Sequence, residues 1–373
     1  MATNGVGLYI HIPFCRSKCK YCDFKSFSNI NEDIRGKYID RLIGEIREYS
    51  GQNIAIKTIF FGGGTPSLLT ANEMQKIVNS VDSVFDVSKD VEFTIEANPK
   101  TIDEEKLRVF KSLGVNRISV GLQTIHEKEL KMLGRIHSYD DFLTSYDAIK
   151  RVGIDNINVD LMYGIPYQTL SSLDKTLDSV ISLNANHISA YGLIIEEGTP
   201  FFDMKNSLSL PGEDEEILMY ELIAKRLSQN GYGHYEISNY ARDGYECQHN
   251  LIYWRDEEYI GLGLSAHSYI GNTRYSNPAS VDEYLFADLN SSRDYVRLDR
   301  EDVEFEYAMM NLRLNLGISL SEYEEKFSIS FLDGREEKIN KYIKLGLLAR
   351  DKDRIFLTER GFYLSNTILS DLL

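Results

Sequence analysis

Short runs of β-branched and aromatic residues alternate with longer amphipathic stretches through the first half of the chain. Between these runs, apolar residues recur every three to five positions, as over residues 34–49 and 170–181, which is typical of helices that bury one face. Six alternations of strand and helix predict an α/β fold with parallel strands, either as a barrel-like sheet or as a doubly wound one. The predicted strands cover residues 7–12, 58–61, 91–95, 117–120, 157–162 and 187–193.

This regular order ends after the sixth unit. A polar stretch over residues 205–216 contains Pro211 and Gly212 and leads into a predicted helix at 217–227. The order after that helix is less regular, and residues 276–302 are predicted to form a second polar connection. We therefore predict that a separate α+β extension follows the six-unit domain.

The last part of the chain predicts two helices, a hairpin and a final helix. The second helix ends before Gly346, segments 347–350 and 354–357 flank a turn, and Thr358 can cap the last helix. This order resembles a winged-helix fold. The predicted domains are residues 1–205 for the six βα units, 206–298 for the extension and 299–373 for the winged-helix-like C-terminal domain.

Composition places the chain among ordinary soluble proteins, since 43% of its 373 residues are hydrophobic and 26% are charged. No apolar run approaches the roughly 20 residues that span a bilayer. Residues 1–9 lack the charged-then-apolar layout of a secretory signal, so we expect a cytosolic protein with reduced thiols. The net charge of −16 argues against nucleic acid as a partner, because phosphates attract lysine and arginine.

Three of the four cysteines, Cys15, Cys19 and Cys22, are crowded into the pattern C-x3-C-x2-C. Structural zinc usually takes four ligands, and His11 alone is a poor fourth. Three thiolates can instead hold three irons of a cubane cluster and leave one iron open. Coincident buried or surface cysteines are the alternative. The surrounding segment 16–25 has a net charge of +3, which suits either a solvated surface or the docking of an acidic reductant.

This cysteine pattern, placed directly after the first predicted strand and followed by an aromatic residue, resembles the radical S-adenosylmethionine (SAM) superfamily. The resemblance implies a partial (β/α)6 barrel and a [4Fe-4S] cluster on the three cysteines. It also implies that the open iron binds the amino and carboxylate groups of SAM, and that an electron from the cluster cleaves SAM to a 5'-deoxyadenosyl radical. The six βα units predicted from the pattern agree with that barrel.

Polar and glycine residues gather where the predicted strands end, which is where parallel barrels bind ligands. They lie in "FGGGTPS", "IEANP", "VGLQT", "LGRIH" and "NVDLMYGIP". Taken singly, each has an ordinary structural explanation, such as a turn or an exposed carboxylate. Together they supply hydroxyl acceptors and a guanidinium for a carboxylate. The resemblance to the coproporphyrinogen dehydrogenase branch of the superfamily implies a SAM site formed by Tyr9, Phe24, Gly62, Gly63, Gly64, Thr65, Glu96, Gln123, Arg135, Asp160 and Gly192.

Two features separate related groups within that branch. The dehydrogenases carry a fourth cysteine where this chain has Phe24, so three cysteines resemble the HemW-type heme chaperones instead. The segment "CQHNLIYW", residues 247–254, resembles the HNxxYW motif of those chaperones and implies a heme site at His249, Tyr253 and Trp254. Read alone, a histidine beside aromatic residues is more often a core residue. Cys247 could be a second ligand, although burial is favoured, and His267 is a weaker candidate.

The leading hypothesis is a heme chaperone that binds a [4Fe-4S] cluster and SAM and transfers heme to apo-haemoproteins, with respiratory proteins as the expected acceptors. Such acceptors imply peripheral contact with a membrane. An electron donor such as a flavodoxin, and either a monomer or a cluster-dependent homodimer, are further expectations. The first alternative is an oxygen-independent coproporphyrinogen III dehydrogenase that forms protoporphyrinogen IX. A winged-helix regulator with a sensory cluster is the second alternative, and the net charge argues against it.

Overall fold

The computed structural model describes residues 5–28 and 31–373. Residues 1–4, part of the N-terminal segment expected to lack a secretory signal, and residues 29–30 lie outside it. Six parallel strands follow one another in chain order, each paired with the next. A doubly wound sheet would reverse its strand order in the middle. The structure is therefore the predicted partial barrel, built from β1 (Val6–Ile12), β4 (Ala55–Gly63), β5 (Asp86–Ala97), β6 (Arg117–Gln123), β7 (Asn156–Tyr163) and β8 (His187–Gly192).

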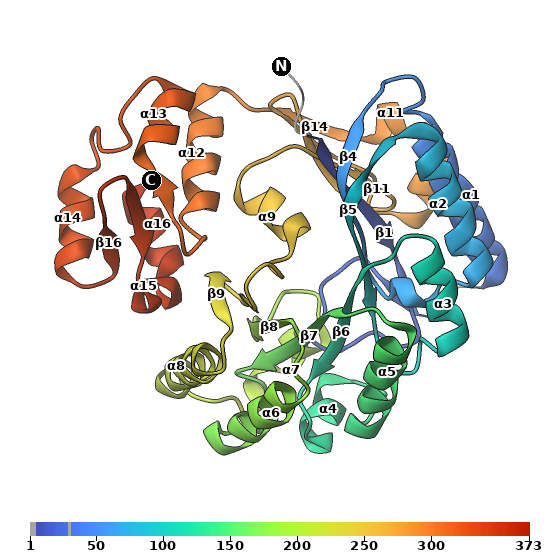
Figure 1. Cartoon of the computed structure of the whole chain (residues 1–373), viewed down its shortest axis with the longest axis horizontal. Helices are drawn as coiled ribbons and strands as arrows, with labels where there is room; N and C mark the ends of the chain where they lie inside the picture. Colours follow the sequence, from blue (N-terminus) through green and yellow to red (C-terminus); the bar gives the residue numbers. More distant parts are fainter. Residues whose placement is uncertain (1–4, 29–30) are drawn as a thin grey trace.

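Helices cover the outer face of this curved sheet (Figure 1). Their ends follow local sequence signals: Thr70 and Glu73 form a capping box at the start of α2, and Gly153 ends α5 in a left-handed conformation. All seven residues of β6 are buried, as expected for a parallel strand covered on both faces. The helices are α1 (Glu32–Arg47), α2 (Ala71–Val84), α3 (Glu104–Ser112), α4 (Glu127–Leu133), α5 (Tyr139–Val152) and α6 (Leu170–Ser182).

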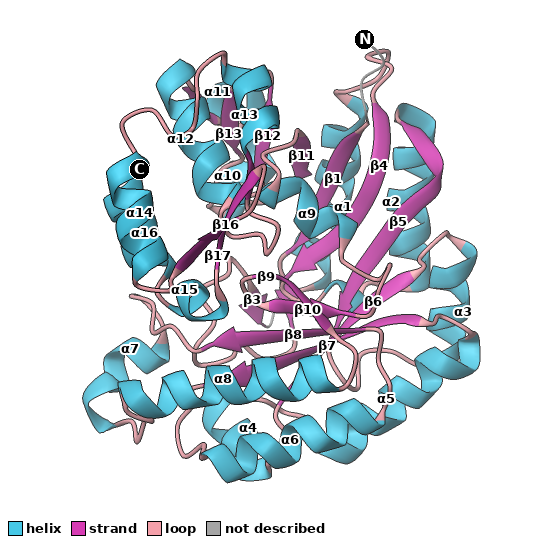
Figure 2. Cartoon of the chain, turned by 60° about the vertical axis from the view of Figure 1, so that its left-hand side comes forward, coloured by secondary structure: helices cyan, strands magenta, loops and turns pink. Residues whose placement is uncertain are grey.

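The sheet continues beyond the barrel at both edges and reaches twelve strands among the described residues (Figure 2). β11 pairs with β1 in parallel, and three antiparallel strands follow it; β10 and β9 extend the other edge from β8. These strands are β9 (Gly233–Glu236), β10 (Asn239–Ala241), β11 (Tyr259–Leu262), β12 (His267–Ile270), β13 (Thr273–Ser276) and β14 (Asp294–Arg297). Three helices accompany them: α7 (Pro200–Met204), α8 (Glu213–Gln229) and α9 (Gln248–Trp254).

The prediction of a polar connection at 276–302 was wrong. This segment holds α10 (Val281–Phe286), α11 (Leu289–Ser292) and β14. The pattern hid them because each short helix buries a single residue, Tyr284 or Leu289, and all four residues of β14 are exposed. The predicted helix at 217–227 is α8, which begins earlier because four acidic residues occupy its first turn and are stabilised by the helix dipole.

The C-terminal part has a hydrophobic core of its own and a three-stranded sheet in the order β15-β17-β16. The predicted hairpin is confirmed as β16 and β17, and Thr358 caps α15, although one more helix follows it. The division into three domains at the predicted boundaries stays a prediction. The elements are α12 (Arg300–Asn311), β15 (Ile318–Ser319), α13 (Leu320–Phe327), α14 (Glu336–Lys344), β16 (Leu348–Arg350), β17 (Arg354–Leu357), α15 (Glu359–Tyr363) and α16 (Ser365–Leu372).

Helix α9, which carries the "HNLIYW" segment, lies on the concave side of the sheet between the barrel strands and the C-terminal helices (Figure 1). It contacts β4 on one side and α12 on the other. Within the described part of the chain, none of the helices combines the length and the apolar composition needed to cross a membrane.

Candidate functional site

A cavity of about 560 Å³ opens inside the curved sheet, and the predicted residues converge on it. Its walls include Cys15, Cys19 and Cys22 and ten of the eleven residues predicted to bind SAM. The exception is Gly62, which is buried in the wall. A side chain there would lie 2.9 Å from the ring of Tyr9. The strand ends that the sequence indicated therefore meet the cysteine loop around one enclosed space.

The cysteine loop is held to the barrel at both ends and in its middle. Strand β2 (Phe14–Cys15) pairs with β3 (Phe27–Ser28) and closes the loop. The Lys20 amide donates to the Leu133 carbonyl at the end of α4 (2.9 Å), and the Lys20 carbonyl accepts from the amide of Phe201 (3.0 Å). Near its end, the Lys25 carbonyl lies 2.8 Å from Nε2 of the buried His11. These contacts fix the loop although its sequence is polar.

The chemistry of the three thiols suits an iron–sulfur cluster. All of them are free and partly buried, and burial raises the pKa of Cys22 to about 11, so a metal must displace its proton. Among the described residues, no three His, Cys, Asp or Glu side chains converge on a point that could hold one metal ion. A cubane spreads its ligands over several irons. Three thiols that line one cavity without converging therefore fit a cluster better than a zinc ion.

The glycine run at the end of β4 allows the backbone to pass unusually close to its neighbours. Gly63 has φ of +110°, and a Cβ atom there would lie 2.4 Å from the ring of His11. Its amide donates to Oε2 of Glu96 (3.1 Å). Only glycine meets both requirements without strain. This run leaves backbone amides beside the cavity, where a larger residue would fill the space.

A chain of hydrogen bonds links the cysteine loop to the predicted SAM residues. Thr65 Oγ1 donates to Sγ of Cys15 (3.7 Å), and the Asn98 amide donates to Thr65 (2.9 Å). Oδ1 of Asn98 accepts from Nη1 of Arg135 (2.7 Å). Asn98 is the link that the sequence analysis missed, although it stands in the quoted "IEANP". One side of the Arg135 guanidinium is thereby fixed.

Two carboxyl groups face the cavity from β5 and β7. Burial and, to a smaller extent, the nearby Asp160 raise the pKa of Glu96 to about 8, although the Gly63 amide and Arg117 oppose the shift. Burial also raises the pKa of Asp160, against hydrogen bonds from Ser119 (3.1 Å) and Asn158 (2.7 Å). Both groups therefore lie in a poorly solvated wall, where each is a strong acceptor for hydroxyl groups once it is ionised.

Gln123 ends β6 in the left-handed region with φ of +72°, and its side chain is buried at the cavity. This conformation is costly for a residue other than glycine, and such strain is concentrated at functional sites. Gly121, two residues earlier in β6, allows the close approach of Arg135, whose Nη2 would lie 2.6 Å from a Cβ atom there. Gln123 and Arg135, both predicted to bind SAM, therefore lie on either side of Gly121 at the end of β6.

The predicted heme residues do not line this cavity, although their neighbour Asn250 does. His249 is 1% exposed and stacks on Phe60, with ring centroids 5.0 Å apart. Both of its ring nitrogens are engaged: Nδ1 lies 2.8 Å from Thr58 Oγ1 and Nε2 lies 2.8 Å from the Tyr253 hydroxyl. Burial and, to a smaller extent, Arg117 lower the pKa of His249 to about 3, so the ring is neutral, as a metal ligand must be.

The other candidate heme residues and Cys247 differ in exposure. Cys247 is confirmed as buried; its thiol lies 3.6 Å from Glu92. Trp254 is half-buried, with the guanidinium of Arg313 over its ring at 5.9 Å. His267 is exposed on β12. In this conformation heme could reach His249 only after the Tyr253 or Thr58 hydroxyl is displaced, so the heme site stays a prediction.

Comparison with known proteins places the chain in a family. The model of the radical SAM superfamily matches residues 9–180, and that of the HemN C-terminal domain matches residues 298–364. The structure is similar to that of coproporphyrinogen III oxidase HemN from Escherichia coli, with a TM-score of 0.85 over 99% of this chain and 90% of that one. At 23% identity, this likeness shows the fold alone.

Curated relatives are similar over their full length. The heme chaperone HemW of Bacillus subtilis (strain 168) is 36% identical over 98% of both chains. HemW of Lactococcus lactis subsp. lactis (strain IL1403) is 36% identical over 98% of this chain and 96% of its own. HemW of Escherichia coli (strain K12) is 34% identical over 98% and 97%, respectively. The chain therefore belongs to the HemW family of the radical SAM superfamily.

Proposed function

We propose that this chain is a heme chaperone that binds a [4Fe-4S] cluster and SAM and transfers heme to apo-haemoproteins. The observation that supports it best is the single cavity in which three unpaired thiols meet the strand-end residues expected to hold SAM. Full-length relatives bearing the name heme chaperone add support from outside the structure.

The residues present fit these cofactors. Cys15, Cys19 and Cys22 would hold three irons as thiolates, and the cluster would supply an open iron and an electron. Arg135, fixed on one side by Asn98, leaves the rest of its guanidinium for a carboxylate. Glu96, Asp160 and the amide oxygen of Gln123 would accept hydrogen bonds from the ribose hydroxyls. The glycine run adds backbone amides at the cavity wall.

The heme would lie at α9, with His249 as its iron ligand. A neutral imidazole is the form that iron binds, and His249 is held neutral by burial. Of its two partners, the Tyr253 hydroxyl on Nε2 can leave by rotation of one side chain, whereas Thr58 is fixed within β4. The Tyr253 side chain would thus block Nε2 of His249 until it rotates away. Trp254 would pack an aromatic face against the macrocycle.

We expect the partners of this chain from the positive charge around the cysteine loop and from the proposed transfer of heme. The exposed Arg16, Lys18 and Lys25 around the cysteine loop form a basic collar for an acidic electron donor such as a flavodoxin. Respiratory haemoproteins as acceptors would bring the chain to a membrane surface. We expect no nucleic-acid partner, and either a monomer or a homodimer that depends on the cluster.

The test is an anaerobic heme titration of the reconstituted protein, followed by its Soret band. We expect saturable binding that is lost or weakened in His249→Ala and kept in His267→Ala, whose histidine is exposed outside the motif. Tyr253→Phe frees Nε2 without removing the ring, so it should bind heme at least as tightly as the unaltered protein. Equal, non-saturating absorbance in all of them would reject the proposal. SAM-dependent formation of protoporphyrinogen IX from coproporphyrinogen III would favour the dehydrogenase.

A further inference from the structure

Arg117 is a buried cation at the cavity that has no assigned role. It is the first residue of β6, is 2% exposed and lines the cavity. Within residues 5–28 and 31–373, its guanidinium makes no hydrogen bond, and its Nε is buried without a partner. In the same described residues, the Nε of Arg135, the other arginine of the cavity, is also buried without a partner, but its Nη1 donates to Asn98 (2.7 Å) and its Nη2 donates to the Gly121 carbonyl (3.5 Å). A buried guanidinium without an acceptor is strongly unfavourable unless an anion binds it.

The nearby carboxylates do not accept from the Arg117 guanidinium, because each already accepts hydrogen bonds from other donors. Glu92 accepts from the amides of Gln248 and His249, both at 3.0 Å, and from the thiol of Cys247. Asp160 accepts from Ser119 and Asn158, and Glu96 accepts from Gly63. These groups attract Arg117 through space but leave its donors free. The guanidinium is therefore available to a ligand in the cavity.

The expected carboxylate of SAM is not that ligand. Arg135 and the cysteines, where the amino-acid end of SAM is expected, lie near the carboxyl end of β6, where Gln123 stands. Arg117 is six residues away at the other end of this strand, or about 20 Å along its backbone. The cavity that Arg117 lines is also lined by Asn250 of α9. A second carboxylate, belonging to a molecule that touches α9, meets these conditions.

We propose that Arg117 binds one propionate carboxylate of the porphyrin, whose ring lies beside α9. This inference rests on the proposed heme-binding function. A planar carboxylate with one charge matches the two parallel donors of a guanidinium. Ionised Asp160, which shares the same wall, would repel a doubly charged phosphate about twice as strongly as a carboxylate with one charge. The assignment deepens the proposed function by giving the porphyrin a polar anchor on the barrel in addition to its iron ligand.

The test compares metal-free protoporphyrin IX with its dimethyl ester on the reconstituted full chain in one dilute detergent, by fluorescence titration. Metal-free porphyrin removes iron ligation by His249 from the measurement. We expect the free acid to bind at least tenfold more tightly than the ester. Arg117→Gln should reduce this preference to less than twofold, and Arg117→Lys should keep part of it. Arg242→Gln, which removes a half-buried cation that packs on Tyr232 away from the cavity and from α9, should keep all of it.

The outcomes distinguish a failure of the Arg117 assignment from a failure of the proposed heme-binding function. Saturable porphyrin binding with equal affinities for acid and ester would overturn the role of Arg117 and leave heme binding intact. A preference that persists in Arg117→Gln, or one that is lost only together with SAM affinity, would overturn it as well. No saturable binding of heme or porphyrin to the unaltered protein would instead reject the proposed function. The comparison of acid with ester needs no variant, so it holds even if Arg117→Gln fails to fold.

Discussion

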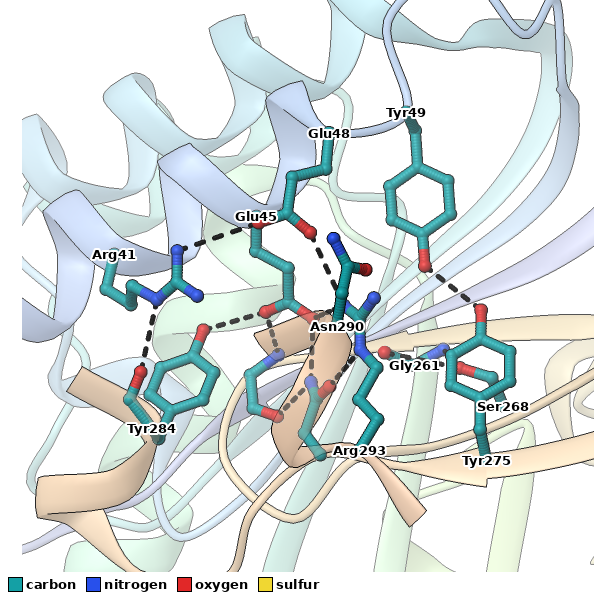
Figure 3. Close-up of polar contacts among 12 residues, drawn as sticks. Arg41, Glu45, Glu48, Tyr49, Gly261, Ser268, Tyr275, Tyr284, Asn290 and Arg293 are labelled. Carbon is teal, nitrogen blue, oxygen red and sulfur yellow. Dashed lines mark hydrogen bonds and ion pairs between the residues drawn. The ribbon is translucent and has the colours of Figure 1, made fainter. Parts of the chain in front are cut away.

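Glu45 on α1 is a fully buried carboxylate that should be essential for stability (Figure 3). It accepts four hydrogen bonds from segments more than 200 residues away. The donors are the Gly263 amide (2.9 Å), Asn277 (2.7 Å), the Tyr284 hydroxyl (2.8 Å) and Arg293 (3.0 Å). These four contacts attach the β11–β14 extension to the first helix of the barrel.

The cost of removing Glu45 can be worked out from these contacts. Taking one partner from a buried ion pair costs about 3–5 kcal/mol. The Gly263 amide adds about 1–3 kcal/mol as an unsatisfied buried donor. Asn277 keeps its bond to the Gly263 carbonyl, and the Tyr284 hydroxyl can rotate, so they add little. We expect Glu45→Ala to lower the free energy of unfolding by about 4–8 kcal/mol. Glu45→Gln should cost about 2 kcal/mol, since it loses the charge and one acceptor.

The assay is urea unfolding combined with native-state hydrogen exchange. The exchange reports the Gly263 amide directly, and a loss of about 2 kcal/mol corresponds to roughly 30-fold faster exchange if that amide opens with the region. Glu48→Gln is the matched control, because Glu48 lies 3.8 Å from the same Arg293 but its side chain is 35% exposed. We expect less than about 1 kcal/mol from it. Equal effects of Glu45→Gln and Glu48→Gln, or a cost below about 2 kcal/mol for Glu45→Ala, would refute the reasoning.

The same cluster supports the base of the cysteine loop. The Tyr38 hydroxyl, also on α1, donates to the His11 carbonyl (2.8 Å) and accepts from the Leu264 amide (3.0 Å). Loosening the extension should therefore loosen the end of β1, from which the cysteine loop starts. Glu45→Ala should consequently retain less iron after reconstitution than Glu48→Gln does.

Three further outcomes are expected. Gly63→Ala should weaken SAM binding at least tenfold in equilibrium dialysis, because the new Cβ atom would lie 2.4 Å from the imidazole of His11. Gly114→Ala controls for backbone strain, since Gly114 has φ of +100° but the nearest contact of its Cβ atom would be at 3.6 Å. Equal losses of SAM affinity in the two variants would contradict a steric role of Gly63. Burial raises the pKa of Glu96 to about 8, so this carboxyl is mostly protonated in the free protein at pH 7. The affinity for SAM should therefore rise about tenfold from pH 6 to pH 7 and level off above pH 8. Glu96→Gln should abolish this pH dependence, and a dependence that persists in the variant would belong to another group. Cys19→Ser should lose cluster absorbance and iron after reconstitution, whereas the buried Cys247→Ser should keep both; matching losses would argue against the three-cysteine site.

The barrel could be predicted because its strands are short apolar runs separated by strongly amphipathic helices. That pattern depends on local burial alone, which the sequence records directly. β14 could not be predicted, because an exposed edge strand has no buried face to mark it. α10 and α11 are held by single anchors, Tyr284 and Leu289, and a single apolar residue sets no period.

The cavity was predictable as far as its residues stand in strand-end motifs. Most of these residues line it, but the groups that orient them were missed. Asn98 and Asn158 act through hydrogen bonds to residues distant in the sequence, such as Arg135 and His187, and neither belongs to a chemically distinctive residue type. Arg117 was predicted only as part of a strand. Its burial without a partner depends on three-dimensional packing that no local pattern encodes.

The placement of α9 restricts how heme can reach His249. Glu92 holds the start of the helix by accepting from the amides of Gln248 and His249, so the backbone there is fixed. The imidazole is fixed on its Nδ1 side by Thr58 of β4. Only Nε2 faces a partner, Tyr253, that can rotate away without breaking the helix or the sheet. Under the proposed function, heme would therefore reach its ligand past Tyr253, and a single side chain would control whether the iron is bound or released.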